Sequence, residues 1–206
     1  MFRVFLAVIL LSVSSLSPAA TDAAASLVKL LGAVNSMQAT FTQQTVDAKG
    51  RAQPLQSGTM SVKRPGLFRW EVQKPAPQLV MTTGKVLWIY DPELMQATKQ
   101  KLDEQVGNTP ALLLSGDPRQ LGEAFAIAEE KGSADKVFVL QPQGKDALFE
   151  YLRVRFQGSK LIEMELADTM SQRTVIRFGD IRVNPALGAQ HFEFVPPRGV
   201  DVIDQL

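Results

Sequence analysis

The sequence predicts a mainly β protein built on one long, curved antiparallel sheet, with helices near the start and in the middle of the chain. From Gln38 onward, apolar and polar residues mostly alternate with the period of two that a half-buried strand requires. Turn residues separate these runs at spacings too short for the crossovers of a parallel sheet. About eleven runs have one apolar and one charged face, so a sheet coiled around its own apolar face satisfies the pattern.

The first 19 residues are predicted to be a cleaved secretory signal peptide. A positive start at Arg3 precedes the unbroken apolar run Val4–Leu11, and small residues reach Ala19, after which we place the cleavage. The run is too short for a membrane span. Residues 20–206 are then expected to form a single exported domain.

The composition of this domain excludes several classes of partner. Arg3 is the only charged residue of the signal peptide, so 21 basic and 21 acidic residues remain, without the surplus of positive charge that nucleic-acid binding needs. No other run approaches the length of a membrane helix. The chain has no cysteine, hence no disulfide and no residue to accept a lipid anchor. We expect a freely diffusing monomer.

Two regions predict helices. Ala23–Met37 places Leu27, Leu30, Leu31 and Val34 at helical spacing, as in an ordinary helix that packs on a sheet. Between Gly107 and Phe125, Thr109-Pro110 and Asp117-Pro118 each have the cap-and-proline pattern that opens a helix. The short helix before Gly116 is apolar nearly all round, which favours contact on two sides.

The strands are expected between turn residues, of which Arg64-Pro65-Gly66 places Pro and Gly at the centre of a type II turn. The predicted strands are Gln38–Val46, Gln56–Lys63, Leu67–Val72, Gln78–Thr82, Val86–Tyr90, Met95–Leu102, Ala126–Glu130, Lys136–Gln141, Phe149–Gln157, Lys160–Ala167 and Arg173–Val183, with a last short one at Phe192–Val195.

Motifs for catalysis, cofactors and metals are missing from the sequence. The only histidine, His191, has no cysteine to activate and no second histidine with which to share a metal ion, and a surface or turn position suits it better. Glu163 and Glu165 share one strand face, but such alternating charges usually mark the solvent side. We therefore expect a protein that is not an enzyme and uses no cofactor.

Large apolar side chains gather in the central third of the chain. The set comprises Met60, Val62, Phe68, Trp70, Met81, Trp88, Leu113 and Leu114. Apolar stripes of this kind usually form a packed core. The alternative is an apolar cavity, because a sheet wrapped about its apolar face can leave space for a ligand.

Arg64 is the sharpest polar candidate. It follows Met60 and Val62 at period two, so an inward-facing Arg64 would need acceptors such as the carbonyls at a helix C-terminus. The alternative is that Arg64 lies in the turn and reaches solvent.

The nine residues Val62-Lys63-Arg64-Pro65-Gly66-Leu67-Phe68-Arg69-Trp70 closely resemble the LolA family of outer-membrane lipoprotein carriers of Gram-negative bacteria. The resemblance continues in order through Phe41-Thr42-Gln43, Gly84-Lys85, Leu87-Trp88, Gln96-Ala97-Thr98, Gly107-Asn108-Thr109-Pro110, Phe194, Pro196-Pro197 and Gly199-Val200.

The resemblance implies an incomplete, half-open β-barrel of about eleven strands, with helices that form a lid over an apolar cavity. It implies that Arg64 bonds to the lid and holds it shut when the cavity is empty. Phe68 would lie on the loop beside Arg64, retain cargo and contact the transporter, and Leu31 and Leu114 would face the cavity. The implied location is the periplasm, and the implied partners are lipoproteins, an inner-membrane ABC transporter complex and an outer-membrane lipoprotein receptor.

Other functions remain as alternatives. A half-barrel module for lipid sensing or regulation would ordinarily add a second domain, for which no residues remain. A membrane-anchored receptor of the same fold requires a lipid-accepting cysteine, and a lipid hydrolase requires a nucleophile–base pair that the sequence does not reveal.

Overall fold

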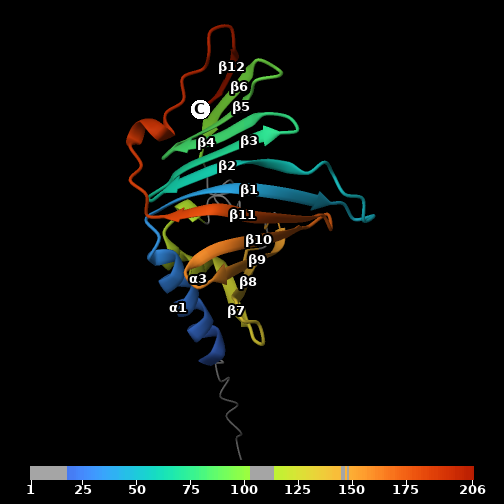
Figure 1. The fold of residues 1–206 in the computed structure, drawn as a ribbon, viewed down its shortest axis with the longest axis vertical. Coiled ribbons are helices and arrows are strands. Elements are labelled where there is room, and N and C mark those ends of the chain that lie inside the picture. The colour runs from blue at the N-terminus through green and yellow to red at the C-terminus, as the bar shows by residue number, and fades with distance from the viewer. Residues whose placement is uncertain (1–17, 103–113, 145–146, 148) are drawn as a thin grey trace, which may run out of the picture.

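The described residues form a single sheet of 12 strands that curves without closing on itself (Figure 1). The computed structural model describes residues 18–102, 114–144, 147 and 149–206. The strand order is β12-β6-β5-β4-β3-β2-β1-β11-β10-β9-β8-β7, so β12 and β7 are the two edges. The mainly β, half-open architecture predicted from the sequence is confirmed.

The strands follow the chain in a meander of antiparallel pairs, except where β1 pairs with β11 and where β12 runs parallel to β6. Their bounds are β1 Ser36–Val46, β2 Gln56–Lys63, β3 Leu67–Lys74, β4 Gln78–Thr83, β5 Val86–Asp91, β6 Gln96–Lys101, β7 Phe125–Glu130, β8 Lys136–Pro142, β9 Phe149–Gln157, β10 Lys160–Asp168, β11 Arg173–Val183 and β12 Asp201–Gln205.

The last predicted strand is wrong. Phe192–Val195 does not form a strand: Ala189–Phe192 is the short 3-10 helix η3, and the twelfth strand is β12 further along. Extended backbone near the C-terminus pairs only where it meets the free edge of β6, and the sequence pattern contains no information on where that edge lies.

The first helix, α1, spans Pro18–Gly32 and is therefore shorter at its C-terminal end than predicted. Ser36 and Met37, predicted as helix, pair with Lys63 and Val62 as the start of β1. The side chain of Asn184 accepts hydrogen bonds from the backbone N–H groups of residues 35 and 36, which draws the chain out of the helix. Residues 1–17 of the predicted signal peptide lie outside the described residues, and the predicted cleavage point lies in the first turn of α1.

Two short helices lie between residues 103–113, which are not described, and β7. They are η2, Pro118–Gln120, and α3, Leu121–Ala124. Asp117 caps the first of them as predicted, because its carboxylate accepts the N–H of Arg119. Helix α1 and α3 both pack against β7, at the end of the sheet opposite β12.

The concave face holds the core. Phe41, Met60 and Phe68 are almost fully buried there on one half, as are Phe138 and Met164 on the other. Residues opposite each other in an antiparallel pair point to the same side, so the strand register continues this apolar face across β8, β9, β10, β11, β1, β2 and β3.

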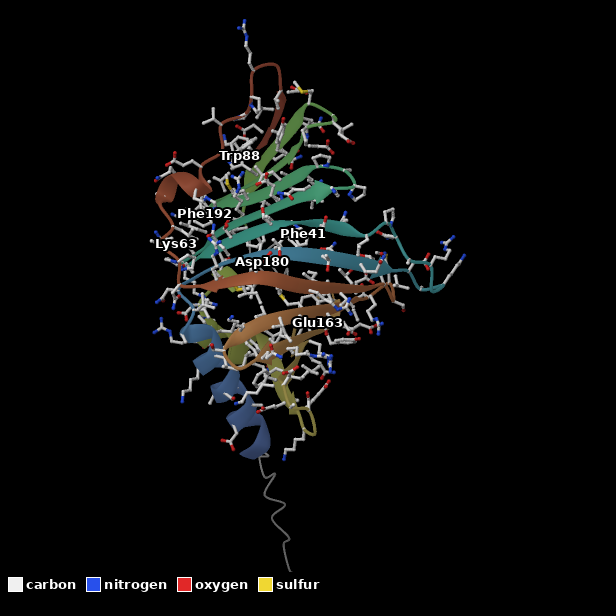
Figure 2. The ribbon with its side chains drawn as sticks, viewed as in Figure 1. Phe41, Lys63, Trp88, Glu163, Asp180 and Phe192 are labelled. Carbon is white, nitrogen blue, oxygen red and sulfur yellow. The ribbon has the colours of Figure 1, made fainter. Side chains whose placement is uncertain are left out.

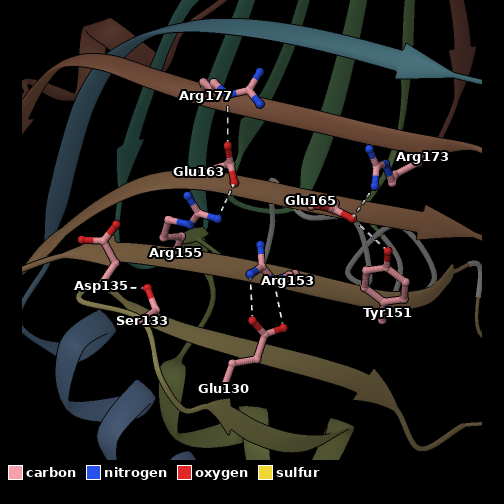
Figure 3. Close-up of polar contacts among 10 residues, drawn as sticks. All are labelled: Glu130, Ser133, Asp135, Tyr151, Arg153, Arg155, Glu163, Glu165, Arg173 and Arg177. Carbon is pink, nitrogen blue, oxygen red and sulfur yellow. Dashed lines mark hydrogen bonds and ion pairs between the residues drawn. The ribbon is translucent and has the colours of Figure 1, made fainter. Parts of the chain in front are cut away.

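On the outer face of β7–β11, charged side chains form a cross-strand network that we call the charge ladder (Figure 3). Glu163 lies between Arg155 and Arg177, at 3.6 and 3.0 Å. Glu165 lies 3.6 Å from Arg173 and accepts the Tyr151 hydroxyl, while Glu130 pairs with Arg153 through two hydrogen bonds. As predicted, Glu163 and Glu165 share the outer face, although the arginines cover much of them.

On the outer face of β2–β6, residues 184–200 cross the sheet as a C-terminal strap (Figure 1). Lys63 donates to the carbonyl of Leu187, and the ring of Phe194 contacts Trp88 and Tyr90 with centroids 5.3 and 5.2 Å away. Figure 2 labels Trp88 and Phe192 on this half and Glu163 on the other. The two halves of the outer face are thus covered by different means.

Candidate functional site

An apolar hollow of about 340 Å³ opens on the concave face between the two halves of the sheet. Side chains from β3 and β4 line one side, and side chains from β10 and β11 line the other. The lining residues are Phe68, Trp70 and Val80, Met164, Leu166, Ile176 and Phe178, together with Leu114 and the polar Gln43 and Thr174.

The strand register explains why these side chains converge. Trp70 stands opposite Met60 of β2 and Val80 of β4, and its ring stacks on Phe41 with centroids 3.7 Å apart. Gly58 permits this arrangement, since a Cβ atom there would lie 1.9 Å from the Glu71 carbonyl oxygen and 3.0 Å from the Phe41 ring. The aromatic wall is therefore held on a close backbone approach.

Most of the predicted cavity residues lie on the concave face. Met60, Val62, Phe68 and Trp70 share that face by register, and all but the half-buried Trp70 are at most 2% exposed. Leu31 of α1 and Leu114 are buried beside them. Leu113 lies outside the described residues.

Met81 and Trp88 do not belong to the hollow, which corrects the prediction from the sequence. Met81 pairs with Arg69 on one side and Trp88 on the other, and that row faces outward. Arg69 also donates to the Met81 sulfur. Met81 is nevertheless fully buried, because the C-terminal strap covers it. An apolar stripe beneath a strap has the same sequence pattern as an apolar stripe facing a cavity.

The family role expected for Phe68 placed it on a loop, but it is the second residue of β3, opposite Val62. Its side chain is 2% exposed. In this conformation Phe68 lines the hollow and is not available to a partner protein.

Toward α1 the concave face is tightly packed. The gap bounded by Leu31, Val62 and Leu114 measures only about 20 Å³. The helical segments and the sheet are therefore in contact at this end, and the hollow extends away from them.

Arg64 joins the segments that meet at this packed end. Its Nε donates to the carbonyl of Gly116 at 2.9 Å, and its Nη1 donates to the carbonyls of Leu31, at 2.5 Å, and Val34. The last carbonyls of a helix lack the regular i+4 N–H partner and are partly negative, so a guanidinium is a suitable additional partner. Of the two alternatives for Arg64, the structure supports the one in which it bonds to helix-end carbonyls.

Burial lowers the pKa of the Arg64 guanidinium from its ordinary value, and the nearby Asp117 carboxylate opposes this change. The pKa of Asp117 is itself about 2, chiefly because Arg119 donates hydrogen bonds to it. The backbone strengthens the same junction: Gly66 N–H donates to the carbonyl of Ser115, and the hydroxyl of Thr82 donates to the carbonyl of Gly66.

A second hollow, of about 420 Å³, lies on the outer face beside His191, and most of its lining residues are polar or charged. There His191 Nε2 lies 2.8 Å from the hydroxyl of Ser61, a contact that sequence reasoning missed. No carboxylate within the described residues hydrogen-bonds the other ring nitrogen. Ser61 is only 5% exposed, so the contact attaches the strap to β2.

Within the described part of the chain, no group of three His, Asp or Glu side chains is placed to hold a metal ion. The helices in the same residues are too short or too polar to cross a membrane.

Comparison with known proteins identifies the family. Residues 32–195 match the family model described as outer membrane lipoprotein carrier protein LolA. The chain belongs to the LolA family. It is 44% identical over 192 residues to the outer-membrane lipoprotein carrier protein of Pseudomonas paraeruginosa, covering 92% of each chain. The protein of the same name from Azotobacter vinelandii is 40% identical over 206 residues, which covers 98% of this chain and all of that one.

The fold also occurs outside these near relatives. An uncharacterized conserved protein of Thermus thermophilus superposes with a TM-score of 0.57 at 12% identity, covering 90% of this chain and 99% of that one. At this identity the likeness concerns the fold alone.

Sequence reasoning missed the side of the hollow of this LolA-family chain that β10 and β11 form, as well as Gln43 and Val80. The apolar lining residues of β10 and β11 alternate with polar residues just as Met60 and Trp70 do. They are Met164, Leu166, Ile176 and Phe178. The signal was present, but about a hundred residues separate the two groups, and only the pairing of β1 with both β2 and β11 brings them together.

Proposed function

We propose that this protein carries lipoproteins through the periplasm by holding their acyl chains in the hollow, as a chaperone without enzymatic activity. Two facts support the proposal: an apolar hollow of about 340 Å³ on the concave face, and relatives named outer-membrane lipoprotein carrier proteins along nearly the whole chain. Residues 1–19 act as the signal for export in this proposal, and residues 20–206 form the carrier domain.

The energetics suit a carrier. Each buried methylene is worth about 0.8 kcal/mol, so one long acyl chain left in water costs on the order of 10 kcal/mol. The hollow removes that cost during transit. Cargo must also leave, so a competing interaction has to favour the empty, closed state.

Arg64 supplies that competing interaction in our proposal. Its hydrogen bonds to Leu31, Val34 and Gly116 exist only while α1 and the segment at Gly116 lie against the β2–β3 turn. Cargo entering toward Leu31 and Leu114 separates these groups, and their reunion helps to expel it. Phe68 becomes available to a partner when the segments separate.

The route follows from the same proposal. An inner-membrane ABC transporter complex loads the carrier, which has no nucleotide motif of its own, and an outer-membrane receptor accepts the cargo. The carrier acts as a monomer.

Release of a bound acylated peptide tests the role of Arg64. Arg64→Leu is expected to bind a fluorescent acylated peptide and to release it several-fold more slowly to an acceptor protein or to detergent micelles. Arg69→Leu is the matched control, because Arg69 pairs with Glu71 on the outer face. Release from Arg64→Leu at the wild-type rate refutes the lock, and failure of the wild type to bind any acylated probe refutes the carrier function.

A further inference from the structure

The apolar lining of the hollow ends at a row of polar side chains on the same concave face. The row consists of Gln43 and Thr45 of β1, Gln56 of β2 and Thr174 of β11. Gln43 and Thr45 follow Phe41 at period two, and their cross-strand partners are Gln56 and Thr174. All four side chains are half-buried, and Gln43 and Thr174 line the hollow itself. We call this row the polar end.

The polar end lies far from Arg64. β1 begins at Ser36, beside α1, and runs away from that helix toward the hairpin at residues 47–55 (Figure 1). From Met37 to Gln43 the strand rises by about 20 Å, at 3.4 Å per residue. An extended fatty chain of ordinary length spans such a distance between the polar end and the packed end near Leu31.

The hydrogen bonds of the polar end leave donors unused. Gln43 Nε2 donates to Gln56 Oε1 at 3.0 Å, and the hydroxyls of Thr45 and Thr174 share one bond of 2.9 Å. A carboxamide has two N–H donors and each hydroxyl has one. Among the described residues, the amide N–H groups of Gln56 and one of the two hydroxyl hydrogens therefore have no acceptor, and they lie beside Gln43 and Thr174, which line the hollow.

We propose that the polar end binds the carbonyl group through which a fatty chain is attached to its head group. This inference rests on the proposed carrier function and extends it to the orientation of the cargo. An ester or amide carbonyl accepts hydrogen bonds, and it costs free energy when it enters an apolar site without a donor. The polar end supplies donors where the hollow meets solvent. The acyl chain therefore runs from the polar end toward Leu31 and Leu114, and the polypeptide of the cargo leaves near the hairpin at residues 47–55.

Three synthetic probes of equal chain length on one short peptide test the proposal. The first carries two ester-linked chains, the second two ether-linked chains without carbonyls, and the third one ether-linked chain and one amide-linked chain. Each useful hydrogen bond changes affinity about twofold to tenfold. The wild type is expected to bind the ester probe at least about threefold more tightly than the ether probe.

Two variants locate the effect. Thr174→Val removes a hydroxyl with little change of shape, and Gln56→Met removes the amide donors; together they are expected to make the affinities for the ester and ether probes equal. Because Thr174 also lines the hollow, urea denaturation of the double variant checks separately that it is folded. Thr42→Val is the matched control, because Thr42 lies on β1 but faces outward and is exposed.

The outcomes separate the two proposals. Equal binding of ester and ether probes by the wild type, or equal weakening of both by the double variant, overturns the role of the polar end and leaves the carrier function intact. Failure of all three probes to bind overturns the carrier function as well. If the third probe regains the affinity that the ether probe lost, the amide carbonyl is a ligand of the polar end, and if it does not, the ester carbonyl is the ligand.

Discussion

The two halves of the outer face solve the same problem in different ways. On β7–β11 the outward side chains are polar, and they satisfy one another in the charge ladder. On β2–β6 several outward side chains are apolar, and the C-terminal strap buries them: Met81 is 0% exposed and Leu79 is 7% exposed. In β7–β11, the alternation between apolar and charged residues therefore reveals which side of a strand faces the core. In β2–β6, both sides of a strand can be apolar, so the alternation does not reveal it.

The comparison also shows where stability is concentrated. The strap uses a few apolar anchors, among them the buried Phe192 and the half-buried Phe194, and loss of an anchor leaves apolar surface exposed. The ladder uses several exposed or half-exposed ion pairs, each worth little by itself. The strap half should therefore respond strongly to single substitutions and the ladder half weakly.

The largest expected effect is that of Phe192→Ala. Phe192 is 2% exposed, so its removal should lower the free energy of unfolding by about 3 kcal/mol or more, through lost burial and a cavity. Urea denaturation measures the change. On the other half, Arg173→Gln removes an exposed partner of Glu165 and should cost less than about 1 kcal/mol. Similar losses for the two variants would contradict the comparison.

Met81→Ala should come next, with a loss of about 2–3 kcal/mol in the free energy of unfolding. Because Met81 lies beneath the strap, the affinity for an acylated fluorescent probe should stay unchanged in the folded variant. Trp70→Leu provides the contrast, since Trp70 lines the hollow, and it should weaken probe binding. Weaker binding by Met81→Ala would place its side chain back in the hollow.

The smallest effect is a difference in the response of the two halves to acid. Burial, followed by the charge of Arg69, lowers the pKa of His191 below its ordinary 6.5, so the unfolded chain binds a proton more readily than the folded one. Stability from the neutral imidazole is present above pH 6.5 and is lost as the pH falls from there toward the folded pKa. The unfolding free energy of the wild type relative to His191→Asn should decline over that range.

Glu130 supplies the corresponding measurement for the ladder. Hydrogen bonds from Arg153 lower the pKa of Glu130 below its ordinary 4.5, so its contribution is present above pH 4.5 and is lost only as the pH falls through the lower folded value. Relative to Glu130→Gln, the wild type should therefore lose stability at a more acidic pH than in the His191 comparison. A loss of stability relative to Glu130→Gln that begins at a higher pH than the loss relative to His191→Asn would contradict this difference between the two halves.

Sequence reasoning succeeded where turn residues bracket a strand. Three predicted strands agree with the structure at both ends: Gln56–Lys63, Phe149–Gln157 and Arg173–Val183. The first two end at turns that contain glycine, and Gly66 and Gly158 have the positive φ that glycine allows. It was less accurate at the end of α1, where Val34 continues the helical apolar pattern although Asn184, 150 residues later, holds the chain outside the helix.

The sequence by itself determined which side chains alternate, where most turns fall and, through the resemblance of the nine residues 62–70, the family. It also singled out Arg64, because a charge in step with Met60 and Val62 must find acceptors. The tertiary structure alone decided which carbonyls Arg64 meets, which face the strap covers and that β11 lies beside β1. Local patterns record how each segment alternates, whereas these outcomes depend on contacts between segments far apart in the chain, which form only when the whole sheet curves around its apolar face.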